Sequence, residues 1–378
     1  MEVIFPPVMA DAAEFPPVTI KAPPKFRLKD LRLFPEQLEL NNIQLTRNGR
    51  GAMGVVGTAL KHSDKKNVIL IPAYHCPALV EPFIHLGYEI RFYPILPSLG
   101  VDISEFRKLL KKDVTHCIVI RYFGFTQNID DVINLAKSER LLVIEDCAHA
   151  LFSFMEYENL GSTSEVDAKI CSINKLLPSI DGGALYFKNN TNIPLLKLSS
   201  WVQELKGCLF LLGITNLINR FRFKTVKQAN YLKDDSEFSH ADTSGLKYFS
   251  PSDMASAGYR HTRFILNHSN FKKVAKKRRY NFDYLLKELN KSKIGKPLYQ
   301  NSENNIPYVF PFLLNDERHF VELRKMGIQV LRWEEVALSD CIISQDYRNR
   351  LVQLPCHQSL RQEELESIVK IINSMENN

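Results

Sequence analysis

The stretch that decides the fold is Leu141-Leu142-Val143-Ile144-Glu145-Asp146-Cys147-Ala148-His149-Ala150. Its apolar run, 141–144, is typical of a strand buried on both faces, as in a parallel sheet covered by helices. Asp146 follows at the carboxyl end of that strand, where open α/β sheets place their ligands. Glu145 alternates to the other side of the strand. We therefore expect Asp146 to face a binding site and give Glu145 no contact there.

A second segment, Ser172-Ile173-Asn174-Lys175, precedes Asp181-Gly182-Gly183-Ala184 and offers a lysine in a turn-rich loop. Pyridoxal phosphate enzymes need this pair: a carboxylate keeps the pyridine nitrogen protonated, and an amine forms a Schiff base with the aldehyde. Alone, a loop lysine is usually a solvated charge, and such an aspartate is usually a turn or cap residue. Together they favour Lys175 as the catalytic amine and Asp146 as the partner of the pyridine nitrogen.

Both segments resemble the DegT/DnrJ/EryC1/StrS family of pyridoxal-phosphate-dependent aminotransferases, which mostly act on nucleotide-linked keto sugars. The family's strand-end motif, E-D-x-A-[QH], fits Glu145–His149, and its lysine lies in a serine-containing segment before a glycine pair. The resemblance extends over about residues 40 to 375 and includes Met254–Gly258, Arg278–Asn281 and Leu354–Leu360. It implies an α/β fold of type I: a large domain with a mixed, mostly parallel sheet and a smaller C-terminal α/β domain.

The order of apolar and polar segments fits that architecture, with predicted strands recurring between helices. We expect a proline-rich arm (1–35), a large cofactor-binding domain (36–240) and a small domain (241–378). The repeated Phe-Pro-Pro-Val of the arm predicts an extended segment over another surface, or alternatively a ligand for a protein partner. The predicted strands are 68–71, 90–93, 117–120, 141–144 and 184–187, and the predicted helices are 49–60, 77–86, 103–110, 129–138, 195–235 and 254–289.

The cofactor site is completed by residues from other segments. Gly49-Arg50-Gly51-Ala52 opens a predicted helix and resembles the family's phosphate-binding S-G-[TR]-x-A, with Arg50 and Gly51 at the phosphate. Ser172 or Asn174 can add a contact there, although the family's phosphate serine lies five residues before the lysine, at Ile170. The family stacks an aromatic ring on the cofactor at the position of Cys76, so Tyr74 or His75 is expected to stack instead. His149 holds the family's Gln/His position, near the cofactor's phenolic oxygen or Lys175.

Substrate contacts are expected from three places. Arg121 and Tyr122 follow the strand 117–120, and Arg121 replaces the histidine that is usual in the family. Trp333 and His357 lie in segments that approach the cleft in relatives. The resemblance implies ping-pong transamination from glutamate to a keto sugar, in a homodimer with shared active sites. A pyridoxal phosphate enzyme of another reaction type, such as a dehydratase, an isomerase or an enzyme aminating a non-sugar natural product, is the alternative, followed by a non-catalytic relative.

Composition excludes several other classes. Of 378 residues 45% are hydrophobic, and 49 Lys+Arg against 42 Asp+Glu give a net charge of +7. This excess suits a small anionic substrate but is too diffuse for nucleic acid. The basic run 272–279 spreads over more than one helix face, which is typical of a solvated surface. We found no spacing typical of a metal site.

Cysteine usage and hydropathy predict a cytoplasmic protein. Seven scattered cysteines without CxxC pairs, and no secretory signal, favour reduced thiols. The longest apolar stretch, 208–218, is shorter than the ~20 residues of a membrane span. With the basic residues that follow it (Arg220, Arg222, Lys224 and Lys227), it predicts a buried or dimer-facing helix or, alternatively, a contact with a membrane surface.

Overall fold

The computed structural model describes residues 3–6, 15–35, 43–127, 129–157, 165–189, 194–214 and 246–376. Its large sheet has seven strands in the order β1-β7-β6-β5-β4-β2-β3. The strands are β1 (Ile43–Thr46), β2 (Val68–Pro72), β3 (Glu89–Tyr93), β4 (His116–Ile120), β5 (Leu142–Cys147), β6 (Ala168–Ser172) and β7 (Gly183–Phe187). Neighbours from β3 through β6 are parallel, whereas β7 and β1 are antiparallel to their neighbours. The predicted mixed, mostly parallel sheet is confirmed.

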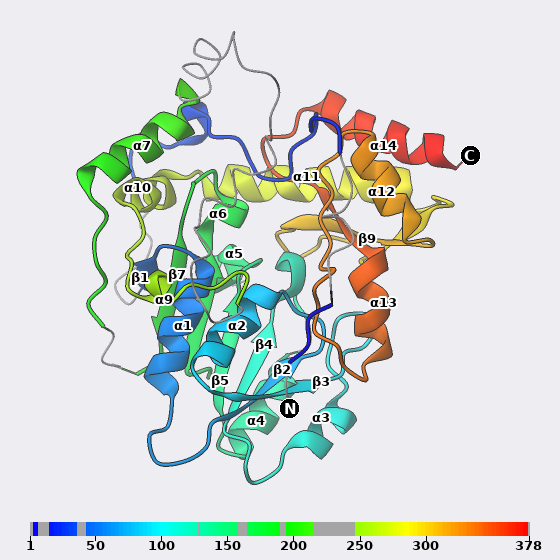
Figure 1. Cartoon of the computed structure of the whole chain (residues 1–378). Helices are drawn as coiled ribbons and strands as arrows, with labels where there is room; N and C mark the ends of the chain where they lie inside the picture. Colours follow the sequence, from blue (N-terminus) through cyan, green and yellow to red (C-terminus); the bar gives the residue numbers. More distant parts are fainter. Residues whose placement is uncertain are drawn as a thin grey trace.

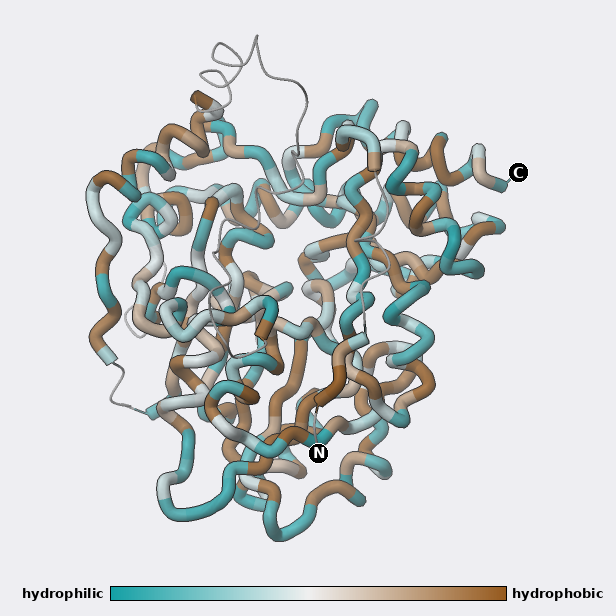
Figure 2. Tube along the Cα trace, in the orientation of Figure 1, coloured by the Kyte–Doolittle hydropathy of each residue, from teal (hydrophilic) through white to brown (hydrophobic). Residues whose placement is uncertain are grey.

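Helices cover both faces of this sheet, so its strands are apolar on both sides. Alternate residues of β2 divide between two cores: Ile69 and Ile71 pack with α1 and α2, and Val68 and Leu70 pack with α3 and α4. Figure 2 shows the resulting hydrophobic colour along the central strands. These helices are α1 (Gly49–Leu60), α2 (Pro77–His85), α3 (Ile103–Leu109) and α4 (Asp130–Ser138), within a residue or two of the predicted bounds.

A second, three-stranded antiparallel sheet lies next to the long helix α11 (Figure 1). Its strands run in the order β10-β9-β8, and every residue of β9 and β10 is buried. The elements of this part are α11 (Phe271–Leu289), β8 (Gly295–Pro297), β9 (Val309–Leu314), α12 (Arg318–Lys325), α13 (Ile342–Arg350), β10 (Leu351–Pro355) and α14 (Gln362–Met375).

The single helix predicted over 254–289 is wrong. The structure has α9 (Pro251–Met254), α10 (Arg260–His268) and α11 in its place. Between α9 and α10 the chain is drawn onto β1, where Ala257 bridges Thr46 and the Gly258 N–H donates to the Leu45 carbonyl. Asn270 then caps α11 by accepting a hydrogen bond from the Lys273 N–H at 3.0 Å. Helical periodicity continues through both breaks, so the pattern alone does not reveal them.

Residues 19–22 of the predicted arm lie against the C-terminal part of the chain. Ile20 is buried and bridges Ile328, while the Thr19 hydroxyl donates to the Gly327 carbonyl at 3.0 Å. The Ala22 N–H donates to Gln329 Oε1 at 3.0 Å. Proline supplies no donor, so these bonds come from residues between the proline pairs.

Two predictions fall largely on residues outside the described ranges. The helical segment 195–235 is represented by α7 (Trp201–Leu211), and 215–245, with the basic residues 220–227, is not described. The domain boundary predicted between residues 240 and 241 lies there as well. None of the helices in the described ranges combines the length and the hydropathy needed to cross a membrane.

Candidate active site

Lys175 and Asp146 are brought together by two neighbouring parallel strands. Asp146 lies near the end of β5, opposite Ile170 of β6, and the chain leaves β6 at Ser172. Lys175 follows within the short helix α6 (Ile173–Leu176) rather than in the expected loop. Carboxyl ends of parallel strands meet at one edge of a sheet, so the two side chains share that edge.

The Asp146 carboxyl is 7% exposed, and its Oδ1 accepts a hydrogen bond from the Ala148 N–H at 2.7 Å. Burial raises the pKa of Asp146 to about 6, while this hydrogen bond and the positive charge of Lys175 oppose the rise. Desolvation penalises the charged carboxylate, and a nearby cation stabilises it. A cationic ring nitrogen next to Asp146 would further stabilise its carboxylate against the cost of burial.

Two glycines at the start of α1 allow neighbouring groups to approach the helix closely. A Cβ on Gly49 would lie 2.4 Å from the Ser172 hydroxyl oxygen, and a Cβ on Gly51 would lie 2.4 Å from the Asp253 carbonyl oxygen. The Arg50 Nε lies 3.9 Å from Asp253 Oδ2. Ser172 and Arg50 are thus gathered at a helix start, where backbone N–H groups favour an anion.

Cys76, Tyr74 and His75 have different surroundings. Cys76 precedes α2, and burial raises the pKa of its thiol against the nearby charges of Lys175 and Arg50, so it belongs to the site. Tyr74 is fully buried, with its ring 4.9 Å from that of Trp333. The His75 ring stacks on Phe92 at 4.9 Å instead, and its Nδ1 bonds the Pro72 carbonyl at 3.0 Å. His75 is therefore engaged away from the other site residues.

His149 is 4% exposed and lies among aromatic rings near Lys175. Its ring stacks on Tyr308 at 4.6 Å and on Phe123 at 5.5 Å. Burial, together with the charge of Lys175, lowers the pKa of His149 well below its ordinary value, so the ring is neutral. Its Nδ1 has no hydrogen-bond partner within the described part of the chain. A buried ring nitrogen without a partner indicates a bound polar group.

Arg121 differs from the expectation of a substrate contact. Its side chain is 3% exposed and forms an ion pair with Glu145, while Lys169 Nζ lies 3.9 Å from the same carboxylate. Glu145 alternates away from Asp146 along β5, so this cluster lies on the reverse face of the strand end. A guanidinium buried against a carboxylate stays there, because separating the pair would leave a buried charge.

The other expected substrate residues are also committed to the fold. The Tyr122 hydroxyl donates to the Tyr74 carbonyl, and its ring is buried. Both ring nitrogens of His357 are occupied: Nε2 bonds the Lys21 carbonyl at 2.9 Å and Nδ1 the Ser359 hydroxyl at 2.9 Å. His357 therefore holds the arm. Asn174 is partly exposed next to Lys175 on α6.

Sequence reasoning missed two neighbours of the site. Asp253 of α9 lies next to Arg50 at the start of α1. Tyr308, which precedes β9, stacks its ring on that of His149. Neither residue lies in a local motif, and both approach from more than a hundred residues away in the sequence. No sequence signal marks them, since only the packing of α9 and β9 brings them near.

These residues fit pyridoxal phosphate on structural grounds. A lysine and a buried carboxyl share one sheet edge, His149 Nδ1 has no hydrogen-bond partner among the described residues, and Gly49 lies open to the Ser172 hydroxyl. Lys175 would hold the aldehyde carbon, Asp146 would face the ring nitrogen, and Gly49–Gly51 with Ser172 would hold the phosphate. The ring face has two candidates, Cys76 and Tyr74.

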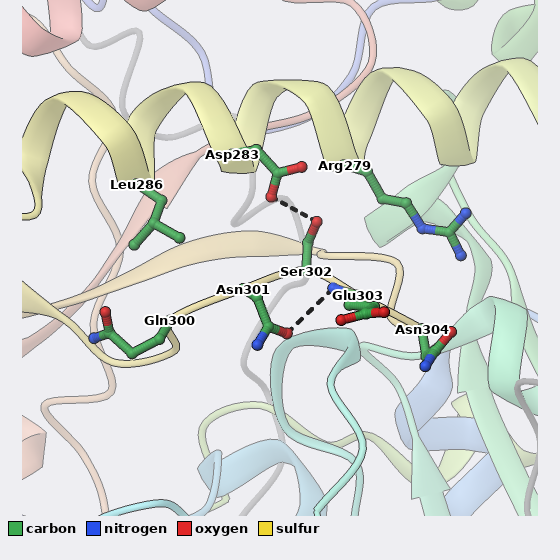
Figure 3. Close-up of a pocket in the computed structure, with 8 residues that line it drawn as sticks. All are labelled: Arg279, Asp283, Leu286, Gln300, Asn301, Ser302, Glu303 and Asn304. Carbon is green, nitrogen blue, oxygen red and sulfur yellow. Dashed lines mark hydrogen bonds between the residues drawn. The ribbon is translucent and has the colours of Figure 1, made fainter.

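Two cavities lie elsewhere in the molecule. One, of about 640 Å³, lies between α11 and the segment 300–304, where Ser302 donates to Asp283 at 2.7 Å (Figure 3). The other, of about 460 Å³, lies where the arm crosses α11. Neither is lined by a residue of the Lys175 site.

One protein-family model matches the part of the chain that forms the large sheet. The model of the DegT/DnrJ/EryC1/StrS aminotransferase family matches residues 38–198. This stretch, less than half of the chain, is similar to that family. The matched range contains Lys175, Asp146 and the start of α1. The family match therefore covers the part of the chain in which these candidate site residues lie.

Two curated relatives carry names of sugar enzymes. A UDP-4-amino-4,6-dideoxy-N-acetyl-beta-L-altrosamine transaminase of Campylobacter jejuni is 27% identical over 139 residues, 35% of this chain and 36% of that protein. A GDP-perosamine synthase of Vibrio cholerae is 24% identical over 151 residues, 40% and 41% of the two chains. The chain thus spans about two fifths of the length of these relatives.

The solved structures extend the likeness to the whole fold. The putative sugar aminotransferase Spr1654 of Streptococcus pneumoniae, in its PMP form, superposes with a TM-score of 0.63 at 15% identity and covers 96% of this chain and 98% of that one. At this identity the likeness concerns the fold. It confirms the predicted type I architecture, including the smaller C-terminal part.

Proposed function

We propose that this chain is a pyridoxal-phosphate-dependent aminotransferase that moves an amino group from glutamate to the keto group of a nucleotide-linked sugar. The observation that carries the proposal is the convergence of Lys175 and Asp146 at the ends of β6 and β5, beside the glycines at the start of α1. The family match of residues 38–198 supports the reaction class. The names of the relatives support a sugar attached to UDP or GDP.

When bound, pyridoxal phosphate supplies an aldehyde for an amine to attach to and a ring that withdraws electrons from the neighbouring carbon. Asp146 would face the ring nitrogen and keep its negative charge there, because a cation at that place would stabilise the carboxylate against the cost of its burial. Lys175 Nζ would hold the group through its aldehyde and, when free, would accept and return a proton at the reacting carbons.

Neutral His149 and the aromatic rings around it complete the site. Because its ring carries no charge, His149 can donate or accept a hydrogen bond through Nδ1 without repelling Lys175. The ring centres of Tyr308, Phe123 and Trp333 lie 4.6 to 5.5 Å from that of His149. Those of Phe123 and Trp333 lie 5.8 Å from each other. These apolar walls exclude water from the reacting atoms, which strengthens the charge interactions inside.

The test compares Lys175→Ala with Lys188→Ala, an exposed lysine directly after β7. We expect amino exchange with isotope-labelled glutamate to fall by roughly 10²- to 10⁴-fold in Lys175→Ala, the size of a lost general acid–base group. Lys188→Ala should keep wild-type exchange. Borohydride reduction of the wild-type holoenzyme should leave a pyridoxyl tag on the peptide with Lys175.

The outcomes separate the alternatives. A tag on Lys175 without glutamate exchange would indicate a pyridoxal phosphate enzyme of another reaction type. No tag and no visible absorbance after saturation with the cofactor would indicate a non-catalytic relative. Retained turnover in Lys175→Ala would contradict the proposed mechanism. We further propose a cytoplasmic homodimer with shared active sites, which sedimentation and mixed-variant complementation would test.

A further inference from the structure

The basic residues 272–279 of α11 point to several sides of the helix. One side lines the groove between α11 and the arm, the cavity of about 460 Å³ described above. Arg278 points inward, where it donates to the carbonyls of Pro307 and Leu176 at 3.0 and 3.1 Å. Arg279 donates to the Asn305 carbonyl at 2.9 Å on another side. Lys273, Lys276, Lys277 and Tyr280 follow the spacing i, i+3, i+4, i+7, so they share one face.

The arm forms the opposite wall of this groove, which has a volume of about 460 Å³. The arm is held in place by several bonds. Arg27 Nη2 donates to the Ser359 carbonyl at 2.9 Å, and the Lys25 N–H donates to the Ser359 hydroxyl at 2.8 Å. Lys273 Nζ reaches across to Asp30 at 2.7 Å. The walls are therefore fixed relative to each other, and the volume is in the range of small-molecule sites, roughly 300–1,000 Å³.

The charge of the groove is strongly one-sided. Five cations line it (Arg27, Lys29, Lys273, Lys276 and Lys277) against one carboxylate, Asp30, which Lys273 already neutralises. Within the described ranges Lys29, Lys276 and Lys277 form no ion pair. Burial lowers the pKa of Lys277, since its ammonium is partly desolvated without an acid beside it. By contrast, the cavity of Figure 3 sets Arg279 against Asp283 and Glu303.

An aromatic ring accompanies these cations. Tyr280 is 50% exposed, and the Lys277 ammonium lies 4.5 Å from its ring centre. The remaining wall includes the apolar side chains of Val274 and Leu360. Neighbouring ammonium groups suit adjacent phosphates, and a half-exposed ring beside an apolar wall suits a planar heterocycle.

We propose that this groove binds a nucleoside diphosphate, with the phosphates on Lys29, Lys276 and Lys277 and the base against Tyr280. The groove shares no lining residue with the Lys175 site, so the binding does not depend on the proposed aminotransferase function. It is a second anion site, built by the N-terminal arm.

The test measures binding of inorganic pyrophosphate and of uridine 5′-diphosphate to the full-length chain by calorimetry at low and physiological salt. We expect saturable binding in the wild type and in Lys175→Ala. The double variant Lys276→Gln/Lys277→Gln should bind both ligands at least about tenfold more weakly, because each lost charge-assisted bond is costly. Lys287→Gln, an 83%-exposed lysine on the same helix, is the matched control and should bind as the wild type does.

Two further variants sharpen the assignment. Lys29→Gln changes the arm side of the groove and leaves α11 unaltered, so it should weaken both ligands about twofold to fivefold, the range for one partly screened charge. Tyr280→Ala should weaken the nucleoside diphosphate and leave pyrophosphate unchanged, since only the base needs the ring.

Four results would overturn the proposal. The first two are no saturable binding at millimolar ligand and equal binding by the wild type and the double variant. The third is loss of binding in Lys175→Ala. The fourth is that the chain binds only vesicles of anionic phosphatidylglycerol, measured in parallel, and neither soluble ligand. The third would place the ligand in the Lys175 site. The last would assign the groove to a lipid surface. Circular dichroism of each variant confirms that a change in binding is not a change in folding.

Discussion

Arg121 and Glu145 form an ion pair buried on the reverse face of the strand end that carries Asp146. Their side chains are 3% and 1% exposed, and Lys169 is a second cation at 3.9 Å from Glu145. The carboxylate of this pair, Glu145, is one residue from Asp146, and its negative charge raises the pKa of Asp146 further. Asp146 can stay ionised beside a second carboxylate because that carboxylate is already neutralised.

Arg121→Met tests this pair. We expect the free energy of unfolding to fall by about 3–5 kcal/mol, because Glu145 is left buried with only the more distant Lys169. Arg121→Met/Glu145→Gln should recover most of that loss, since it removes the orphaned charge. Urea unfolding of the wild type, both single variants and the double variant gives the coupling energy. A single variant that loses less than about 1 kcal/mol would show that the pair is not needed.

Asp146→Asn separates stability from function. Burial raises the pKa of Asp146 to about 6 from its ordinary value of 3.8. The folded chain without cofactor therefore binds this proton more tightly than the unfolded chain, and the associated stability, present below about pH 4, is lost as the pH rises through 6. An uncharged amide at this position avoids that loss, so the variant should be more stable than the wild type at pH 7 by up to about 3 kcal/mol.

The same variant should lose activity by roughly 10²- to 10³-fold, since the ring nitrogen loses its negative partner. Urea unfolding at pH 4.5 and pH 7.5 without cofactor, together with glutamate exchange in the holoenzyme, measures both effects. Parallel pH profiles for the two proteins would contradict the buried-carboxylate account.

Gly51→Ala tests the close approach at the start of α1. The added Cβ would lie 2.4 Å from the backbone carbonyl oxygen of Asp253, so either α1 or α9 must move. We expect pyridoxal phosphate to bind at least about tenfold more weakly, as a small displacement of backbone donors weakens anion binding strongly. Gly100→Ala is the control, because its Cβ would meet only the Ser98 hydroxyl at 3.2 Å. Absorbance titration measures both affinities, and equal values would rule out the phosphate site at the start of α1.

His357→Phe tests the attachment of the arm. It leaves the Lys21 carbonyl without its partner, so we expect a loss of about 1–3 kcal/mol in unfolding free energy and faster tryptic cleavage near Lys21 and Lys25. His319→Phe, on the surface of α12, should change neither. An unchanged cleavage rate would mean that the other arm contacts suffice.

The pH dependence of the arm follows from the same ring. Burial lowers the pKa of His357 to about 3, so the folded chain binds this proton less tightly than the unfolded chain. Its contribution to stability is therefore full above about pH 6.5 and is lost as the pH falls towards 3. The phenylalanine variant should show a shallower loss over that range, measured by thermal unfolding at pH 7 and pH 5.

Local sequence determined β2 to β5, β7 and α1 to α4, and the chain order of Asp146 and Lys175, whereas β1 and β6 were not among the predicted strands. Apolar runs such as 68–71 and 141–144 indicate buried strands from the sequence alone, because every residue in them is apolar and suits a strand covered on both faces. The strand-end acid and the lysine after the next strand then share an edge, since parallel neighbours end together.

Only the tertiary structure decided what the remaining polar side chains do. Arg121 and His357 were expected at the substrate, but one pairs with Glu145 and the other holds an arm more than three hundred residues earlier in the chain. The breaks around α10 arise from contacts with β1, and the groove arises where residues 27–30 cross α11. A charged or polar side chain bonds to the groups that lie within about 3 Å of it in the folded chain. Which groups these are depends on the packing of the whole chain and not on the residue's neighbours in sequence.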